Sequence, residues 1–132
     1  MILNIFLGLI SAVILLLYTS NKYPIKIVKI WGNALLFAAI IYVGFAIFGQ
    51  NWKWLPIELG GVIIYGIFVF LSKKYSPYFL AIGWATHVFW DLVVHPNGHP
   101  GYVPEWYPGV CLGFDIAIAV YFVWYIFVSK NP

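Results

Sequence analysis

The sequence predicts an all-α fold, an integral membrane bundle of five transmembrane helices. Hydrophobic residues make up 64% of the 132 positions and charged residues only 8%, whereas a soluble domain carries about 25% charged residues. The apolar runs are also continuous, without the apolar–polar alternation of membrane-barrel strands. Because so little polar surface cannot cover a water-soluble protein, we expect the chain to lie in a lipid bilayer.

Apolar runs bounded by turn-forming or charged residues mark the spans. The first lacks the basic start and cleavage site of a signal peptide, so we expect it to be retained as a helix. Pro24 lies in a basic segment, 21–29, that we expect to be a loop, whereas Pro56 suits the first turn of the third helix. Lys73 and Lys74 are expected to follow that helix. The expected spans are residues 1–18, 31–48, 54–71, 78–94 and 108–128, within a single transmembrane domain, 1–132.

A turn-rich linker separates the last two spans. Ser76 and Pro77 mark the start of the fourth span, and Pro108 and Gly109 open the fifth. Residues 95–108 contain glycines, prolines and aromatics but no lysine. A lid over a site and a solvated loop both fit this composition.

The lysines indicate how the helices are oriented. Three lysines follow the first span, two follow the third and one lies in the tail, whereas Lys53 alone lies at the opposite helix ends. Basic residues accumulate on the cytoplasmic side of membrane proteins, so we expect the N-terminus outside and the C-terminus in the cytoplasm. Because these charges sit at helix ends, they indicate topology, and no nucleic-acid partner is expected.

Ionisable residues interrupt the fourth span at a regular spacing. His87, Asp91 and His95 are four positions apart, and four residues advance only about 40° beyond a full helical turn, so one face is expected to carry all three. Such residues are costly in a membrane and usually functional. Glu58 and Asp115 lie within about two turns of the same outer end of their own spans. The sequence therefore predicts an intramembrane polar site near the outer face.

Histidine and carboxylate together predict a site for a divalent metal ion, zinc or iron. An i, i+4 pair on one helix is a known metal-binding arrangement. His87 and His95 are about 12 Å apart along an ideal helix, so either one of them is an acid–base group or Asp91 bridges two ions. The candidate metal ligands are His87, Asp91, His95, Glu58 and Asp115, and the candidate catalytic residues are Asp91, His87 and Asp115.

These residues also have purely structural explanations. Glu58 in a first helical turn and His95 at a helix end both suit the helix dipole. A His–Asp pair would also join the fourth and fifth helices without further function. Three more residues are candidates, with packing or solvation as the alternative: Cys111, which shares a helix face with Asp115, and His99 and Glu105 in the linker.

One combination of motifs points to a family. Trp84 to His95 is followed by Trp106-Tyr107-Pro108 and by Cys111 with Asp115. This pattern resembles a group of small bacterial multi-pass membrane proteins of unknown function, over roughly the last third of the chain. The resemblance implies a bacterial inner or plasma membrane but no activity.

Two better-known families share only general features with this chain. Membrane di-iron desaturases also space histidines at i, i+4 but use many more of them. Ceramidase-like transmembrane hydrolases resemble it in placing His and Asp from several helices around zinc, but they have more spans. The residues of neither family carry over to this sequence.

Three functions remain open at this point. The leading hypothesis is a metal-dependent membrane enzyme, a hydrolase or oxidoreductase, acting on a lipidic or apolar substrate. The alternative is a proton- or cation-coupled transporter, which the scarcity of polar residues in the inner half disfavours. The third is a structural or accessory subunit. The lipid bilayer is the expected partner, and a homo-oligomer remains open.

Overall fold

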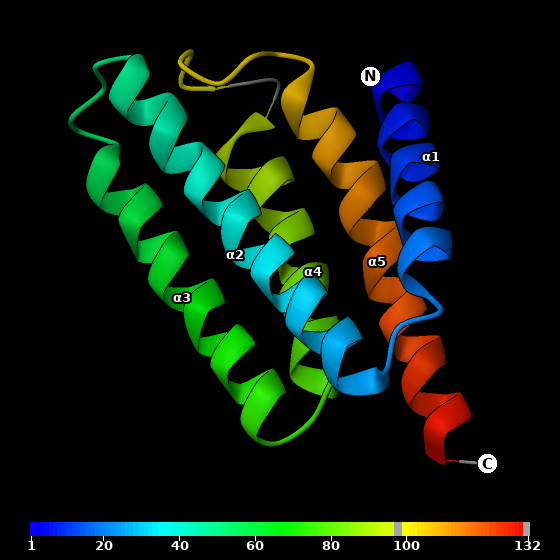
Figure 1. Ribbon diagram of the computed structural model, residues 1–132. Coiled ribbons are helices and arrows are strands. Elements are labelled where there is room, and N and C mark those ends of the chain that lie inside the picture. Colours follow the sequence, from blue (N-terminus) through cyan, green and yellow to red (C-terminus); the bar gives the residue numbers. More distant parts are fainter. Residues whose placement is uncertain (97–98, 131–132) are drawn as a thin grey trace.

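The chain folds into five helices joined by short connections, as a computed structural model that describes residues 1–96 and 99–130 shows (Figure 1). No strand occurs in this part of the chain, so the all-α prediction is confirmed. The elements are α1 (Ile2–Thr19), α2 (Pro24–Phe48), α3 (Leu55–Lys74), α4 (Tyr78–Phe89), the π-helical turn η1 (Trp90–Val94) and α5 (Tyr107–Lys130).

Four helical segments are long and apolar enough to cross a membrane. They are Ile2–Thr19, Lys26–Phe48, Leu55–Lys74 and Tyr107–Val128. The remaining apolar stretch, Tyr78–Val94, is shorter and packs against α3 and α5. The architecture is thus a helical membrane bundle in which a shorter helix accompanies four long ones.

Successive helices run in opposite directions, so the N-terminus and the C-terminus lie at opposite ends of the bundle (Figure 1). We call the end with the N-terminus and the connection 95–106 the loop end, and the opposite end, where α1 joins α2 and α3 joins α4, the lysine-rich end. α1 packs along α5, α2 along α3, and α4 contacts both pairs. The core between them includes Trp31, Trp84 and Phe122.

Three helices extend beyond the predicted spans. α2 begins at Pro24, so the prediction that 21–29 is a loop is wrong from this residue onward. Proline is tolerated at the first position of a helix, where its missing N–H has no acceptor to lose. α3 includes Lys73 and Lys74 in its last turn, where cations interact favourably with the helix dipole. α5 continues to Lys130, and the rest of the predicted tail, 131–132, lies outside the described residues.

Close backbone contact joins α1 to α5. A Cβ added to Gly8 would overlap the carbonyl oxygen of Val110, and one added to Gly113 would overlap that of Ile5. Only glycine allows the two helix backbones to approach so closely. This packing fixes the position of α5, which carries part of the site described below.

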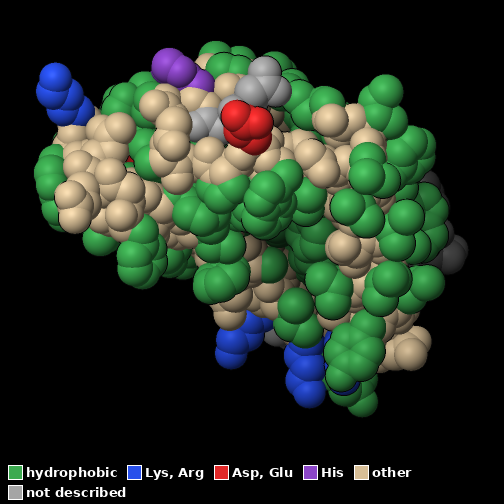
Figure 2. All heavy atoms as spheres, turned by 90° about the horizontal axis from the view of Figure 1, so that it is seen from above, with side chains coloured by type: hydrophobic (Ala, Val, Ile, Leu, Met, Phe, Trp, Pro, Cys, Tyr) green, Lys and Arg blue, Asp and Glu red, His purple; other side chains and the backbone are tan. Residues whose placement is uncertain are grey.

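The described part of the connection, 95–96 and 99–106, lies over the loop end of the bundle. Its Val103 is buried, whereas His99 and Glu105 are exposed. The view onto this end shows acidic and histidine side chains beside largely uncharged surface (Figure 2). Positions 97 and 98 of the predicted turn lie outside the described residues.

Candidate metal centre

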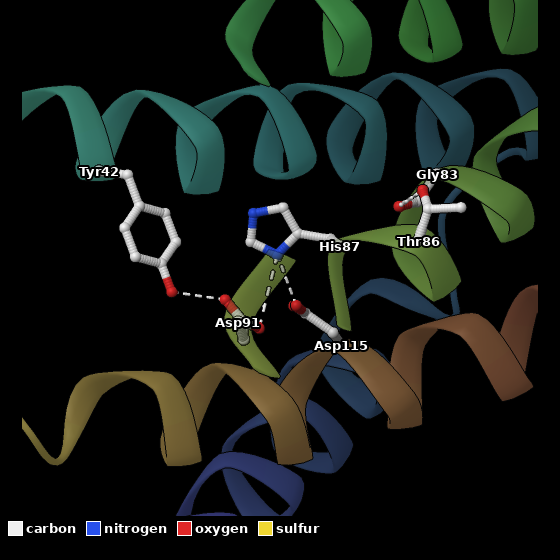
Figure 3. A network of polar contacts seen from close by, with 6 residues as sticks. All are labelled: Tyr42, Gly83, Thr86, His87, Asp91 and Asp115. Atoms are coloured by element: carbon white, nitrogen blue, oxygen red, sulfur yellow. Dashed lines mark hydrogen bonds and ion pairs between the residues drawn. The ribbon is translucent and has the colours of Figure 1, made fainter. Parts of the chain in front are cut away.

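Three ionisable side chains meet inside the bundle (Figure 3). They lie in the last turn of α4, in η1 and in the first half of α5, and so nearer the loop end. His87 Nδ1 lies 2.6 Å from Asp115 Oδ2 and 3.7 Å from Asp91 Oδ2. Each residue is at most 1% exposed. α4 contributes the histidine, η1 contributes Asp91 and α5 contributes Asp115. We call these three residues the His–Asp cluster.

Tyr42 connects α2 to this cluster. Its hydroxyl donates a 2.5 Å hydrogen bond to Asp91 Oδ1 (Figure 3). The tyrosine is fully buried, and its ring stacks on that of His95 with centroids 4.4 Å apart. Because Oδ1 is bonded to Tyr42, the other oxygen of Asp91 is the one that faces His87. Tyr42 is not among the residues expected from the sequence, since a tyrosine in an apolar span looks like an ordinary packing residue.

The cluster has the chemistry and spacing of a metal site. One ligand atom from each of its residues lies within 4.8 Å of the other two. Ligands of a tetrahedral zinc ion at about 2.0–2.1 Å would be about 3.3 Å apart, which lies between the 2.6 and 3.7 Å contacts of His87. An imidazole nitrogen that faces two carboxylates either carries a proton or shares a cation with them.

Unpaired polar atoms support the second arrangement. His87 Nε2 and Asp91 Oδ2 are buried without a hydrogen-bond partner. Buried polar atoms are nearly always hydrogen-bonded, so such exceptions often mark a site for an ion or water. Asp91 Oδ2 can therefore accept a cation without losing a hydrogen bond, whereas a cation at His87 Nδ1 would replace the contact of that nitrogen with Asp115 Oδ2.

Glu58 and His95 form a second buried pair. His95 Nε2 lies 2.6 Å from Glu58 Oε1, and His95 Nδ1 donates to the carbonyl oxygen of His99 at 2.8 Å. The Tyr102 hydroxyl also donates to Glu58. Within the described residues, the group that could hold a metal ion is the His–Asp cluster alone. The structure thus brings three of the five expected ligands together and pairs the other two separately.

His95 lies at the end of the π-helical turn and outside the cluster. The His95 N–H bonds to the carbonyl oxygen of Trp90, five positions earlier, at 3.2 Å. The π-turn therefore directly precedes His95 and interrupts the α-helical hydrogen bonding at this end of the span. His95 also ends the helix, at φ −124° and ψ 49°, and its side chain reaches Glu58 on α3. His95 therefore pairs with Glu58, whereas His87 and Asp91 meet Asp115.

Tyr102 anchors the loop-end connection to α3, because its hydroxyl donates a hydrogen bond to Glu58 of the Glu58–His95 pair. Burial and the hydrogen bond to Glu58 raise the pKa of Tyr102 well above its usual value of 10.0. The phenol therefore remains a donor to Glu58 across the physiological range. This contact holds the connection 95–106 over the loop end of the bundle.

The three additional candidates lie apart from the cluster. Cys111 is a buried free thiol that lines, together with Asp115, the wall of an apolar groove. His99 is exposed, and its ring packs edge-on against Trp54 with centroids 5.9 Å apart. Glu105 is exposed on the same connection. None of the three is within the group that could hold a metal ion.

Two cavities reach the cluster from different sides. An apolar groove of about 370 Å³ has Asp115 in its wall. A small cavity of about 50 Å³ at the loop end has Asp91, Pro96 and Pro108 in its wall. The small cavity exceeds the roughly 10–15 Å³ that one water molecule requires. The site is therefore bordered by an apolar space on one side and a water-sized space on the other.

Comparisons of the chain with models of known families, with characterised proteins and with solved structures find no match. The site itself is therefore the basis for inferring a function. The fold and site together define a helical membrane protein with a buried His–Asp cluster.

Proposed function

We propose that the protein is a membrane-embedded, metal-dependent hydrolase that acts on a lipidic substrate. The observation that carries this proposal is the convergence of one imidazole and two carboxylates, all buried, within 4.8 Å. His87, Asp91 and Asp115 would hold a divalent ion, zinc or iron. Such an ion supplies a Lewis acid that polarises a carbonyl group or activates water.

The chain's own residues have distinct roles in this proposal. Asp91 borders the water-sized cavity, so its carboxylate is placed to accept a proton from a water molecule there. His87 Nδ1 and Asp115 Oδ2, 2.6 Å apart, are the facing atoms that would share the ion. Tyr42 orients Asp91 through the bond to Oδ1.

The surroundings of the cluster favour hydrolysis of an apolar molecule. The groove beside Asp115 is lined almost entirely by apolar side chains, as expected for a site that takes its substrate from a bilayer. The cavity beside Asp91 offers room for water. A hydrolase needs access for an apolar substrate and access for water. If the bound metal is iron and not zinc, oxidation becomes the proposed reaction.

The two alternatives explain fewer of these features. A helix-joining role accounts for the contact between His87 and Asp115 but leaves Asp91 Oδ2 without a hydrogen-bond partner. A transporter needs polar groups toward the lysine-rich end. The described polar side chains there pair locally, Asn33 with Lys73 and Thr19 with Trp31, and do not continue the cluster.

Elemental analysis of protein purified in mild detergent without chelators tests the proposal. The wild type should contain a stoichiometric transition metal, and Asp91→Asn and Asp115→Asn should lose it. Glu105→Gln removes an exposed carboxylate outside the cluster and should retain the metal. Metal-free wild type, or a content unchanged in both asparagine variants, would contradict the metal site.

Activity is tested separately in proteoliposomes. Wild-type protein should release a lipid hydrolysis product detectable by mass spectrometry, and the release should stop when a chelator removes the metal. Products that contain added oxygen without bond cleavage would point to oxidation instead.

A further inference from the structure

We propose that the apolar groove binds one acyl chain of a membrane lipid and presents the polar end of that lipid to the His–Asp cluster. The groove lies between α2 and α5 and also touches α1 and α4. Aromatic contacts bridge α2 and α5 at Trp31–Phe114 and Tyr42–Tyr107. The assignment of the polar end rests on the proposed function, whereas binding of the chain does not require the metal.

The groove opens toward the surroundings of the bundle. Leu15, Ile30 and Phe37 line it and are exposed, so they form its rim. Trp84 and Asp115 also line it and are buried, so they form its floor. All these residues belong to the apolar helical stretches of the bundle. The molecules next to the rim are therefore bilayer lipids.

The dimensions of the groove fit a single hydrocarbon chain. Its α2 residues extend from Ile30 to Ile41, which is about 16 Å along the helix axis, close to the roughly 15 Å depth of one leaflet. Its volume of about 370 Å³ then gives a cross-section of about 20 Å². Carbon atoms in contact lie about 4 Å apart, so one extended chain needs about that area. A helix about 10 Å across needs about 80 Å² and does not fit.

The charge distribution of the groove complements an acyl lipid. Asp115 is its only ionisable carboxylate, and it sits against His87. Cys111 is the neighbouring polarisable group, and the other lining side chains are almost all uncharged and apolar. An acyl chain thus meets largely apolar surface along the groove and reaches a carboxylate at the cluster.

Trp84 supplies an independent sign of a ligand. It belongs to the floor of the groove, is 1% exposed, and its indole Nε1 has no hydrogen-bond partner among the described residues. A buried donor without an acceptor is unfavourable. A carboxyl or ester oxygen of a bound lipid provides the missing acceptor.

Photolabelling tests this binding directly. Two probes are used in nanodiscs: palmitic acid and a phosphatidylcholine, each carrying a diazirine on the acyl chain. Labelled peptides are mapped by mass spectrometry, with and without prior removal of metal by a chelator. Wild-type label should concentrate on 30–41 and 107–115 in both conditions. A preference for one probe distinguishes a free fatty acid from an intact phospholipid.

Filling the groove provides the matched comparison. Ala38 lines it, and Ala38→Trp should lower labelling of these segments about tenfold, because the indole displaces several chain methylenes. If Ala38→Trp folds poorly, Ala34→Phe replaces it, because Ala34 lines the same groove. Ala85 is exposed and lies outside the groove, so Ala85→Trp should label like the wild type.

The outcomes separate this inference from the metal site. Label spread evenly over exposed helix faces, or unchanged by both groove variants, would overturn the acyl-chain site even if the metal is present. Focused labelling of a protein that contains no metal would support the groove while contradicting the metal site.

Discussion

Tyr42 and Asp91, 49 positions apart in the sequence, are joined by a 2.5 Å hydrogen bond inside the bundle. The bond ties α2 to η1 and leaves one carboxylate oxygen of Asp91 directed at His87. The orientation of a candidate ligand therefore depends on a residue that cannot itself be recognised as part of a site from the sequence.

Tyr42→Phe should weaken metal binding while preserving the fold. Loss of a group that orients a ligand typically lowers metal affinity about 10- to 100-fold, and the phenylalanine ring can keep the stacking on His95. Competition with a chromophoric chelator measures the affinity. The matched control is Tyr78→Phe, since Tyr78 is exposed. Equal affinities in all three proteins would show that the bond does not position Asp91 for a metal.

Gly113→Ala should force α1 and α5 apart. The new Cβ would overlap the carbonyl oxygen of Ile5, and overpacking of this kind typically lowers the free energy of unfolding by about 1–3 kcal/mol. Circular dichroism during titration with a denaturing detergent measures the loss. A Cβ added to Gly60 would have no neighbour within 4 Å, so Gly60→Ala should be neutral or slightly stabilising. Equal stability of both variants would contradict the close helix contact.

The Tyr102 phenol should stay protonated above pH 10. Burial and the hydrogen bond to Glu58 raise its pKa above the usual 10.0. Because the folded pKa is raised, the stabilisation is present below pH 10 and is lost only as the pH rises toward the folded value. The ¹³Cζ shift of labelled tyrosine, assigned with Tyr102→Phe, follows the titration.

Glu58→Gln is the comparison for that titration. It removes the negative charge beside the phenol, so the pKa of Tyr102 should fall, although burial should keep it above the usual value. A Tyr102 that titrates normally in the wild type would show that the connection 95–106 is not anchored at Glu58.

The loop end should face the outside of the cell, following the distribution of the lysines. In a Cys111→Ser background, Glu105→Cys should react with a membrane-impermeant maleimide in intact cells. Ser20→Cys, at the other end of the bundle, should react only after permeabilisation. Both side chains are exposed in the structure, so burial would not explain a difference. The reverse pattern would invert the proposed topology.

The sequence predicts most of the helical architecture because continuous apolar runs identify membrane helices without tertiary information. The start of α2 is the main error, since Pro24 fits a loop and a first helical turn equally well when only local chemistry is considered. The sequence also places the acids of three helices at similar depths, which correctly indicates polar residues inside an apolar bundle.

Depth along a helix does not determine which side chains face one another. Which side chains meet depends on how the helices are rotated and packed. Close contact at Gly8 and Gly113 positions α5, and Asp115 of α5 therefore meets His87. The helix ends at His95, whose side chain pairs with Glu58 and not with the cluster. The sequence by itself determined a bundle of apolar helices with buried ionisable residues. Only the tertiary structure decided their partners, because those contacts join residues from different helices.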